Sequence, residues 1–366
     1  MKRPMFSLLL IAGSLIAEGS LAQSSPASSS AAPKTAPTAP NLATAQPRNL
    51  ALLSAVKTSM NAGTFGFPLK CDQDGNLYLK NSIDGVPGIH KLDPEGRQMT
   101  VIQANAAAPD VKIAAAHYFS IAKNGYVYQH VGSWNKPHYL VYVYGPEGSF
   151  KSCVKLQESF PWTPAQVAAF PSGNLLVTGL EYDRDRKAAK WPFTGIFSPD
   201  GTLLKEVKFE DDDAIHDMAA AGDTRVTSPE APGVNHAVGS GQVDLANDGN
   251  VYVMRRLSPA ILYAISPEGE VVRRFTVDAG QPDYMPDSMH IAGNRIAVQL
   301  VHPQSEDQLI KVVDLEGREL ATYHVDRTLP SPLGYAIACY TSSPDRFTFL
   351  GETDDGRLTL NVAGPK

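Results

Sequence analysis

The sequence predicts an all-β protein, a six-bladed β-propeller built from four-stranded antiparallel blades. Two short turn signals alternate along the chain, and this alternation is the basis of the prediction. The first signal is a turn with a glycine, followed by alternating β-branched and aromatic residues, which is typical of a β-hairpin. Its copies begin at Asp74, Asn124, Ser172, Asp248 and Gly293, with a degraded sixth copy at Ser343.

The second signal is, in most copies, a proline, an acidic residue and a glycine in succession. Proline presets the backbone of a turn, and glycine accepts the positive φ that ends it. Each repeat therefore reads strand, turn, strand, loop, strand, turn, strand, with a period of about 40 to 50 residues, as in a propeller blade. The copies are Asp93–Gly96, Gly145–Gly148, Ser198–Gly201, Ser266–Gly269 and Asp314–Gly317.

One interval between turn glycines, from Gly173 to Gly249, is longer than the others but too short for two blades. It predicts an insertion at about residues 208–240, and almost no helix is expected anywhere. Because a closed ring removes open sheet edges, residues 50–57 or 64–69 are expected to add a strand to the last blade. A seven-bladed ring and a pair of β-sandwiches are the alternatives.

The N-terminus predicts export from the cytoplasm. Residues 1–22 combine Lys2 and Arg3, an apolar run and a small-residue cleavage site, as a signal peptide does. The apolar run has about 12 residues, fewer than the roughly 20 that a spanning helix needs. Residues 23–48, rich in Ser, Ala and Pro, are expected to be a disordered linker. The propeller would occupy residues 49–366, in the periplasm or outside the cell.

Composition excludes some partners and leaves others open. The net charge is −6 with both signs mixed along the chain, so nucleic acid is not expected as a partner, and no transmembrane segment is expected in the mature protein. Cys71, Cys153 and Cys339 allow at most one internal disulfide and show no metal-ligand spacing. We expect them to be small, buried, apolar side chains.

Two segments carry a family resemblance. Asp248–Val253 followed by Ser266–Gly269 resembles the NHL-repeat propellers, and is similar to the gluconolactonase and senescence-marker group of six-bladed propellers. The resemblance covers about residues 64–363. It implies a site in the central channel, where gluconolactonase-type members hold a divalent metal with an early Glu and with Asn and Asp side chains. The corresponding stretch here, residues 66–69, contains no carboxylate.

The innermost strand of each blade should line the channel, and it precedes each turn of the first signal. Imidazole and carboxylate groups that converge there could hold a divalent metal such as calcium or zinc, or act as an acid and base pair. The alternative is that the histidines are hydrogen-bonded within a packed wall. The candidate channel residues are His117, Gln166, Gln242, Asp244, Asp287 and His290.

Two further features lie in predicted loops. The acidic run from Glu210 to Asp213 could bind calcium, but a solvated acidic loop is the preferred interpretation. Aromatic residues could form a recognition surface on one rim, although tryptophan also packs between blades. The candidate rim residues are Trp134, His138, Trp162 and Trp191.

No catalytic constellation follows the repeat, so the sequence leaves open whether the protein is an enzyme. The preferred hypothesis is an exported propeller that binds a small-molecule ligand, a peptide or an envelope protein on one face. The alternative is a metal-dependent hydrolase of lactonase type, or a lyase, with its site in the central channel. A third hypothesis is a component of a surface or wall assembly, anchored through the linker.

Overall fold

The computed structural model divides the chain into residues 1–44 and residues 45–366. The structure describes only part of the chain. The expected signal peptide, the linker up to residue 46 and most of residues 221–240 lie outside the described residues. Among the described residues, no helix is both long and apolar enough to cross a bilayer. The described residues are 47–62, 66–83, 86–104, 110–181, 191–220, 237–238, 241–305, 307–325, 333–334 and 336–366.

Four sheets contain four antiparallel strands each, in sequence order. The first has β2 (Gly66–Cys71), β3 (Leu77–Ile83), β4 (Val86–Leu92) and β5 (Gln98–Ile102). The second has β6 (Ile113–Ile121), β7 (Val127–Ser133), β8 (Tyr139–Tyr144) and β9 (Phe150–Lys155). The third has β10 (Trp162–Ala169), β11 (Leu175–Glu181), β12 (Trp191–Phe197) and β13 (Leu203–Glu206). The fourth has β14 (Gln242–Leu245), β15 (Val251–Arg255), β16 (Ala260–Ile265) and β17 (Val271–Val277).

A fifth sheet contains eight strands and joins the two ends of the propeller chain. β1 pairs with β24 along most of its length, from Leu50 opposite Pro365 to Asn61 opposite Arg357. On its other side β1 meets β21 only at Arg48 and Asn49. The expectation that residues 50–57 supply a strand to the last repeat is confirmed. In order, its strands are β18 (Met285–Ala292), β19 (Arg295–Val301), β20 (Gln308–Asp314), β21 (Glu319–Val325), β1 (Arg48–Asn61), β24 (Arg357–Pro365), β23 (Arg346–Glu352) and β22 (Ala336–Thr341).

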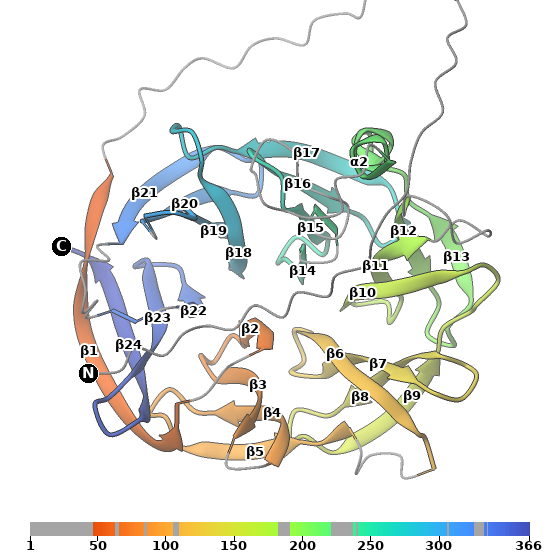
Figure 1. Cartoon of the computed structure of the whole chain (residues 1–366), viewed down its shortest axis with the longest axis horizontal. Coiled ribbons are helices and arrows are strands. Elements are labelled where there is room, and N and C mark those ends of the chain that lie inside the picture. Colours follow the sequence, from red (N-terminus) through yellow and green to blue (C-terminus); the bar gives the residue numbers. More distant parts are fainter. Residues whose placement is uncertain are drawn as a thin grey trace, which may run out of the picture. The chain divides into compact units, whose positions relative to one another are not determined.

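The sheets are arranged around a common centre (Figure 1). The strands nearest that centre are β2, β6, β10, β14, β18 and β22, and each contacts the next, with β22 returning to β2. The predicted all-β propeller of four-stranded antiparallel sheets is thereby confirmed. Each of these strands ends directly before a turn of the first signal, as expected for the strands that line the channel.

The middle strands of a sheet are buried on both faces, whereas the outermost strand is not. Every residue of β15 and β16 is buried, because both faces of the sheet are covered by neighbouring sheets. In contrast, the outermost strand β17 is exposed or half-buried until Val277. The two turn signals behave as predicted: Gly75 and Gly201 both have positive φ, and at Gly201 a Cβ atom would lie 2.0 Å from the carbonyl oxygen of Lys155.

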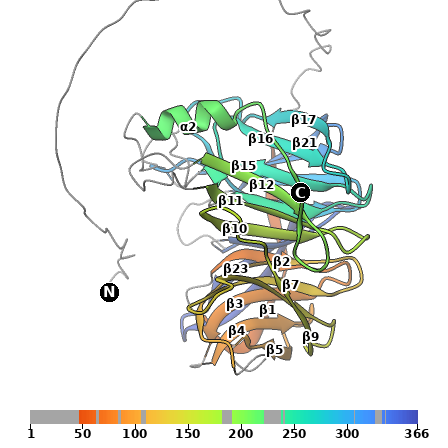
Figure 2. The same cartoon turned by 90° about the vertical axis from the view of Figure 1, so that its right-hand side faces the viewer.

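The insertion contains a helix, α2 (Asp212–Ala220), which lies against β12 (Figure 2). The expected solvated acidic loop is wrong at Asp212, because this side chain is buried and paired. The Arg255 guanidinium donates to Asp212 Oδ1 at 2.7 Å, and the Phe209 amide donates to Asp212 Oδ2 at 2.9 Å. A carboxylate at this position can be buried because a buried cation compensates it and because it accepts a hydrogen bond from the Phe209 amide just before the helix.

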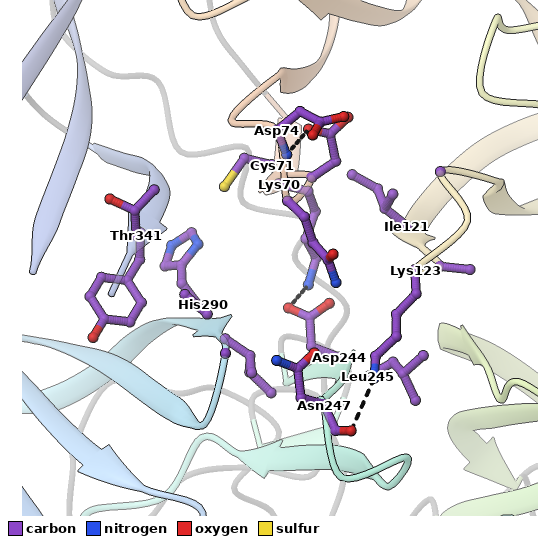
Figure 3. Close-up of a pocket in the computed structure, with 18 of the residues that line it drawn as sticks. Lys70, Cys71, Asp74, Ile121, Lys123, Asp244, Leu245, Asn247, His290 and Thr341 are labelled. Carbon is purple, nitrogen blue, oxygen red and sulfur yellow. Dashed lines mark hydrogen bonds and ion pairs between the residues drawn. The ribbon is translucent and has the colours of Figure 1, made fainter. Parts of the chain in front are cut away.

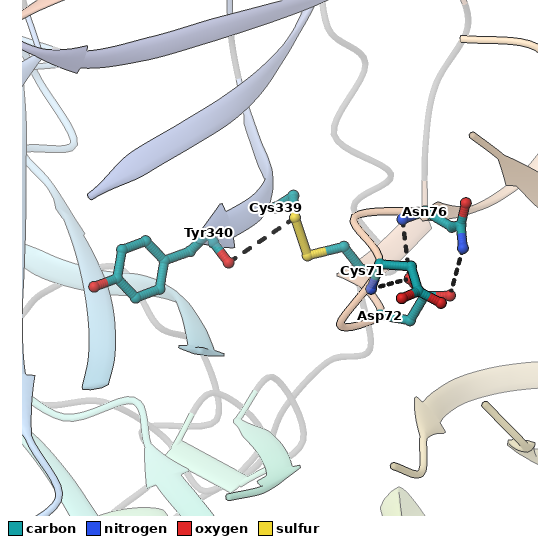
Figure 4. Close-up of a disulfide and its surroundings, with 6 residues drawn as sticks. Cys71, Asp72, Asn76, Cys339 and Tyr340 are labelled. Atoms are coloured by element: carbon teal, nitrogen blue, oxygen red, sulfur yellow. Dashed lines mark hydrogen bonds between the residues drawn. A yellow bond between two sulfur atoms is a disulfide. The ribbon is translucent and has the colours of Figure 1, made fainter. Parts of the chain in front are cut away.

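Two of the three cysteines form a disulfide, so the expectation of three buried thiols is wrong for Cys71 and Cys339 (Figure 4). The bond joins β2, the first inner strand, to β22, the last. The bonded residues are 268 positions apart in sequence. Cys153 is free and partly buried. The disulfide thus links the two ends of the circle of inner strands.

We predict that the double variant Cys71→Ser/Cys339→Ser loses about 2 to 5 kcal/mol of unfolding free energy, because the cross-link restricts the unfolded chain over a long loop. Urea unfolding under oxidising conditions measures this loss. The single variant Cys153→Ser is the matched control, with a change below about 1 kcal/mol. Equal urea midpoints for the double variant and the wild type would contradict a stabilising role for the bond.

Candidate functional site

A pocket of about 530 Å³ opens where the inner strands turn into the second strands of their sheets. Small-molecule sites in proteins commonly measure about 300 to 1,000 Å³. Its wall includes Lys70 and Cys71 from the end of β2, Asp244 from β14 and His290 from β18 (Figure 3). The ends of several inner strands, distant in sequence, therefore contribute to one site.

An ion pair crosses the channel beside this pocket. The Lys70 ammonium donates to Asp244 Oδ2 at 2.5 Å and to the Val243 carbonyl at 3.2 Å. The two charged residues occupy equivalent positions of their repeats, since Lys70 pairs with Tyr78 and Asp244 with Tyr252, each three residues after a turn glycine. Lysine in one repeat and aspartate in another thus meet at the same level of the channel.

Burial dominates the electrostatics of this pair. The Lys70 side chain is 5% exposed and the Asp244 side chain 16%. Burial raises the pKa of the Asp244 carboxyl, and the Lys70 ammonium and its hydrogen bond oppose that rise. Because removing either partner leaves a charge without compensation in a poorly solvated place, the pair behaves as a unit.

His290 is the third polar group at this level. Its side chain is buried, and its Nε2 atom has no hydrogen-bond partner among the described residues. Burial, reinforced by the nearby Lys70 ammonium, lowers the pKa of His290 to about 3. The imidazole is therefore neutral at physiological pH. It can offer one hydrogen bond at Nε2, as donor or acceptor according to its tautomer.

Two more lysines lie on the pocket wall. The Lys91 ammonium donates to the Pro146 carbonyl at 3.2 Å and lies 3.7 Å from Asp72 Oδ2. Lys123, which is exposed, donates to the Asn247 carbonyl at 3.0 Å and so connects the second and fourth sheets. Asp74 is an exposed carboxylate on the same wall. The lining thus contains both signs of charge.

Of the candidate channel residues, the structure places Asp244 and His290 in this pocket and leaves Gln166, Gln242 and Asp287 outside its lining. The side-chain Oε1 of Gln242 accepts from the Met289 amide at 2.8 Å, which joins β14 to β18. Gln166 is buried on β10. Asp287 lies 3.4 Å from the Arg256 guanidinium. His117 belongs to β6, but its side chain lies outside the described residues.

The candidate rim residues do not line the pocket either. Trp162 is 2% exposed and stacks on Phe197, so its proposed place on a rim surface is wrong: the side chain fills space between sheets. Trp134 is 73% exposed. Trp191 is partly exposed, and its ring stacks on His216 of α2. His138 is partly buried beside Tyr139.

Sequence reasoning missed the lysines of the pocket. The available signal was Lys70 itself, a charged residue near the end of a strand that is otherwise mostly apolar, at the position that Asp244 holds in another repeat. The described stretches hold no group of three or more His, Cys, Asp or Glu side chains that could bind a metal.

No protein-family model matches this chain, and no curated protein matches it. Several solved structures are similar. An exported-protein candidate from Bacteroides fragilis is 10% identical with a TM-score of 0.51, over 88% of this chain and 98% of that one. A member of a domain-of-unknown-function family from Bacteroides vulgatus is 7% identical with a TM-score of 0.50, over 88% and 99%. Regucalcin from Agrobacterium tumefaciens, a calcium-binding protein, is 13% identical with a TM-score of 0.41, over 88% and 97%. At these identities the likeness concerns the fold.

We predict that Asp244→Asn lowers the unfolding free energy by about 3 to 5 kcal/mol, because it leaves the buried Lys70 ammonium uncompensated. The double variant Lys70→Met/Asp244→Val should recover most of this loss, since it removes both charges. Urea unfolding at pH 7 measures both changes. If the double variant were as unstable as the single one, packing rather than charge compensation would explain the loss.

The depressed pKa of His290 predicts a pH dependence of stability. The unfolded imidazole binds a proton near pH 6.5 and the folded one near pH 3, so the unfolded state holds more protons in between. Stability should therefore fall as pH drops below 7. The His290→Gln variant should lack this loss of unfolding free energy, which reaches about 2 kcal/mol at pH 5. Urea unfolding at pH 7 and pH 5 tests this. The control Asn247→Ala should show the same change in unfolding free energy between the two pH values as the wild type.

Proposed function

We propose that the protein is an exported propeller that binds a small polar ligand in the pocket at the turn end of its central channel. The observation that carries this proposal is the buried His290 Nε2, which has no hydrogen-bond partner in the described part of the chain and lies beside the Lys70–Asp244 pair on the pocket wall. Buried polar atoms in folded proteins almost always have hydrogen-bond partners, and a ligand is a natural one in a pocket of this size.

The proposal includes a ring of six blades. The eight-stranded sheet would count as two blades, β18–β21 and β22–β24 with β1, because only Arg48 and Asn49 join them. The closed circle of inner strands supports this interpretation. In such a ring the sheets that carry Lys70 and Asp244 lie opposite one another, which explains how their side chains meet across the channel.

Export is supported by two independent features. Residues 1–22 have the charged start, apolar run and cleavage site of a signal peptide. The Cys71–Cys339 disulfide is typical of oxidising compartments such as the periplasm. A ligand of this protein would therefore be encountered outside the cytoplasm.

We predict that a small molecule accompanies the protein, residues 23–366, when it is purified from its native host without denaturation. Mass spectrometry of a methanol extract should detect it with the wild type and with the surface control Trp134→Ala. The pocket-filling variant His290→Trp should lose it, because the larger ring occupies the site. Retention of the same compound by His290→Trp would contradict binding in this pocket.

A thermal unfolding scan distinguishes the metal-dependent hydrolase or lyase hypothesis from the ligand-binding proposal. The scan is run after chelation and again after addition of Ca²⁺, Mg²⁺, Mn²⁺ or Zn²⁺. A metal that binds only the folded state at 100 times its dissociation constant adds about 2.7 kcal/mol. The ligand-binding proposal predicts an unchanged unfolding midpoint. A clear rise with one metal would favour the enzyme hypothesis over the present proposal.

A further inference from the structure

We propose that the ligand of this pocket is a small zwitterion, a molecule that carries one ammonium and one carboxylate, as a free amino acid or short peptide does. This inference rests on the proposed binding function and specifies its chemistry. The ligand's carboxylate would bind the Lys70 ammonium and its ammonium would bind the Asp244 carboxylate, so that the ion pair across the channel exchanges partners with the ligand.

The first argument is charge compensation. Lys70 and Asp244 are largely buried and compensate each other at 2.5 Å. A ligand with a single charge that displaced one of them would leave the other without a partner, which is strongly unfavourable in a buried place. A zwitterion supplies both missing charges at once, so both buried residues stay compensated when the ligand is bound.

The second argument is unused hydrogen-bonding capacity. The Lys70 ammonium has three N–H groups and donates to Asp244 Oδ2 and the Val243 carbonyl. Within the described part of the chain, Asp244 accepts at Oδ2 only from Lys70, and its Oδ1 accepts no hydrogen bond. His290 Nε2 is unpartnered beside them. Both charges and the imidazole therefore have hydrogen-bonding capacity left for a ligand.

The third argument is the balance of charge around the pair. Lys91 lies 3.7 Å from Asp72, and the exposed Lys123 and Asp74 lie on the same wall. Of the residues that the structure describes, three lysines and three aspartates line the pocket, so neither sign of charge is in excess among them. This balance disfavours multiply charged anions such as phosphates, and also free cations. A ligand with no net charge and strong local charges fits it best.

Asp72 is not available to such a ligand, which concentrates recognition on Asp244. Its carboxylate already accepts from the backbone amides of Asp74 and Asn76, from the Asn76 side chain and from the Tyr78 hydroxyl. Lys91 lies over the Tyr78 ring beside it. These groups form a saturated structural cluster, whereas Asp244 and His290 keep free atoms.

The test is isothermal titration calorimetry of the mature protein with each of the twenty free L-amino acids and with dialanine. For the amino acid or dipeptide that binds, the size-matched amine without carboxylate and the acid without amine are titrated next. We expect each analogue to bind at least about 30-fold more weakly, because one buried charge would then lose its partner. The variant Lys70→Met/Asp244→Val should show a similar loss while remaining folded by circular dichroism.

The outcomes separate this inference from the binding function on which it rests. Equal affinity for the zwitterion and its single-charge analogues would overturn the inference, as would unchanged zwitterion binding by the double variant. No binding of any zwitterion, together with a co-purified neutral or anionic compound that His290→Trp loses, would also overturn it while the binding function stands. Absence of both zwitterion binding and any compound dependent on the pocket would refute the two together.

Discussion

Pairing of β1 with β24 is the constraint on which the rest of this structure depends. The strand after the N-terminal segment and the last strand of the chain lie antiparallel from Leu50 to Asn61, and this pairing brings the two ends of the propeller together. The disulfide acts at the same junction but at the inner end, where it connects β2 with β22. Backbone hydrogen bonds therefore close the ring at its outer side, between β1 and β24, and a covalent bond closes it at its inner side, between β2 and β22.

The pocket depends on this closure. Cys71 directly follows Lys70, and Tyr340 directly follows Cys339, and all four residues are at the ends of β2 and β22. The disulfide consequently positions the strand that carries the lysine of the cross-channel pair. The same junction therefore affects both the stability of the ring and the geometry of the site.

Charged side chains have two distinct roles in this fold. The Asp248 carboxylate, like that of Asp72, accepts hydrogen bonds from its own turn and from a tyrosine, and Arg273 compensates it at 2.8 Å. Such groups stabilise turns, and their hydrogen-bonding capacity is used. Asp244 and His290 keep unused atoms at the pocket. At the pocket, this difference in saturation, rather than the presence of charge, separates Asp72 from Asp244 and His290.

The sequence by itself determined the strands, the turns and the repeat, because these depend on local residues such as Gly75 and Gly201, whose positive φ no other residue adopts easily. It also indicated Asp244 and His290 as channel candidates. Only the tertiary structure decided that Lys70, 174 positions away, meets Asp244, that Trp162 is buried and that Cys71 bonds Cys339. The physical reason is that such contacts depend on how the ring closes, and on the face that each side chain occupies, neither of which is encoded in any short stretch of chain.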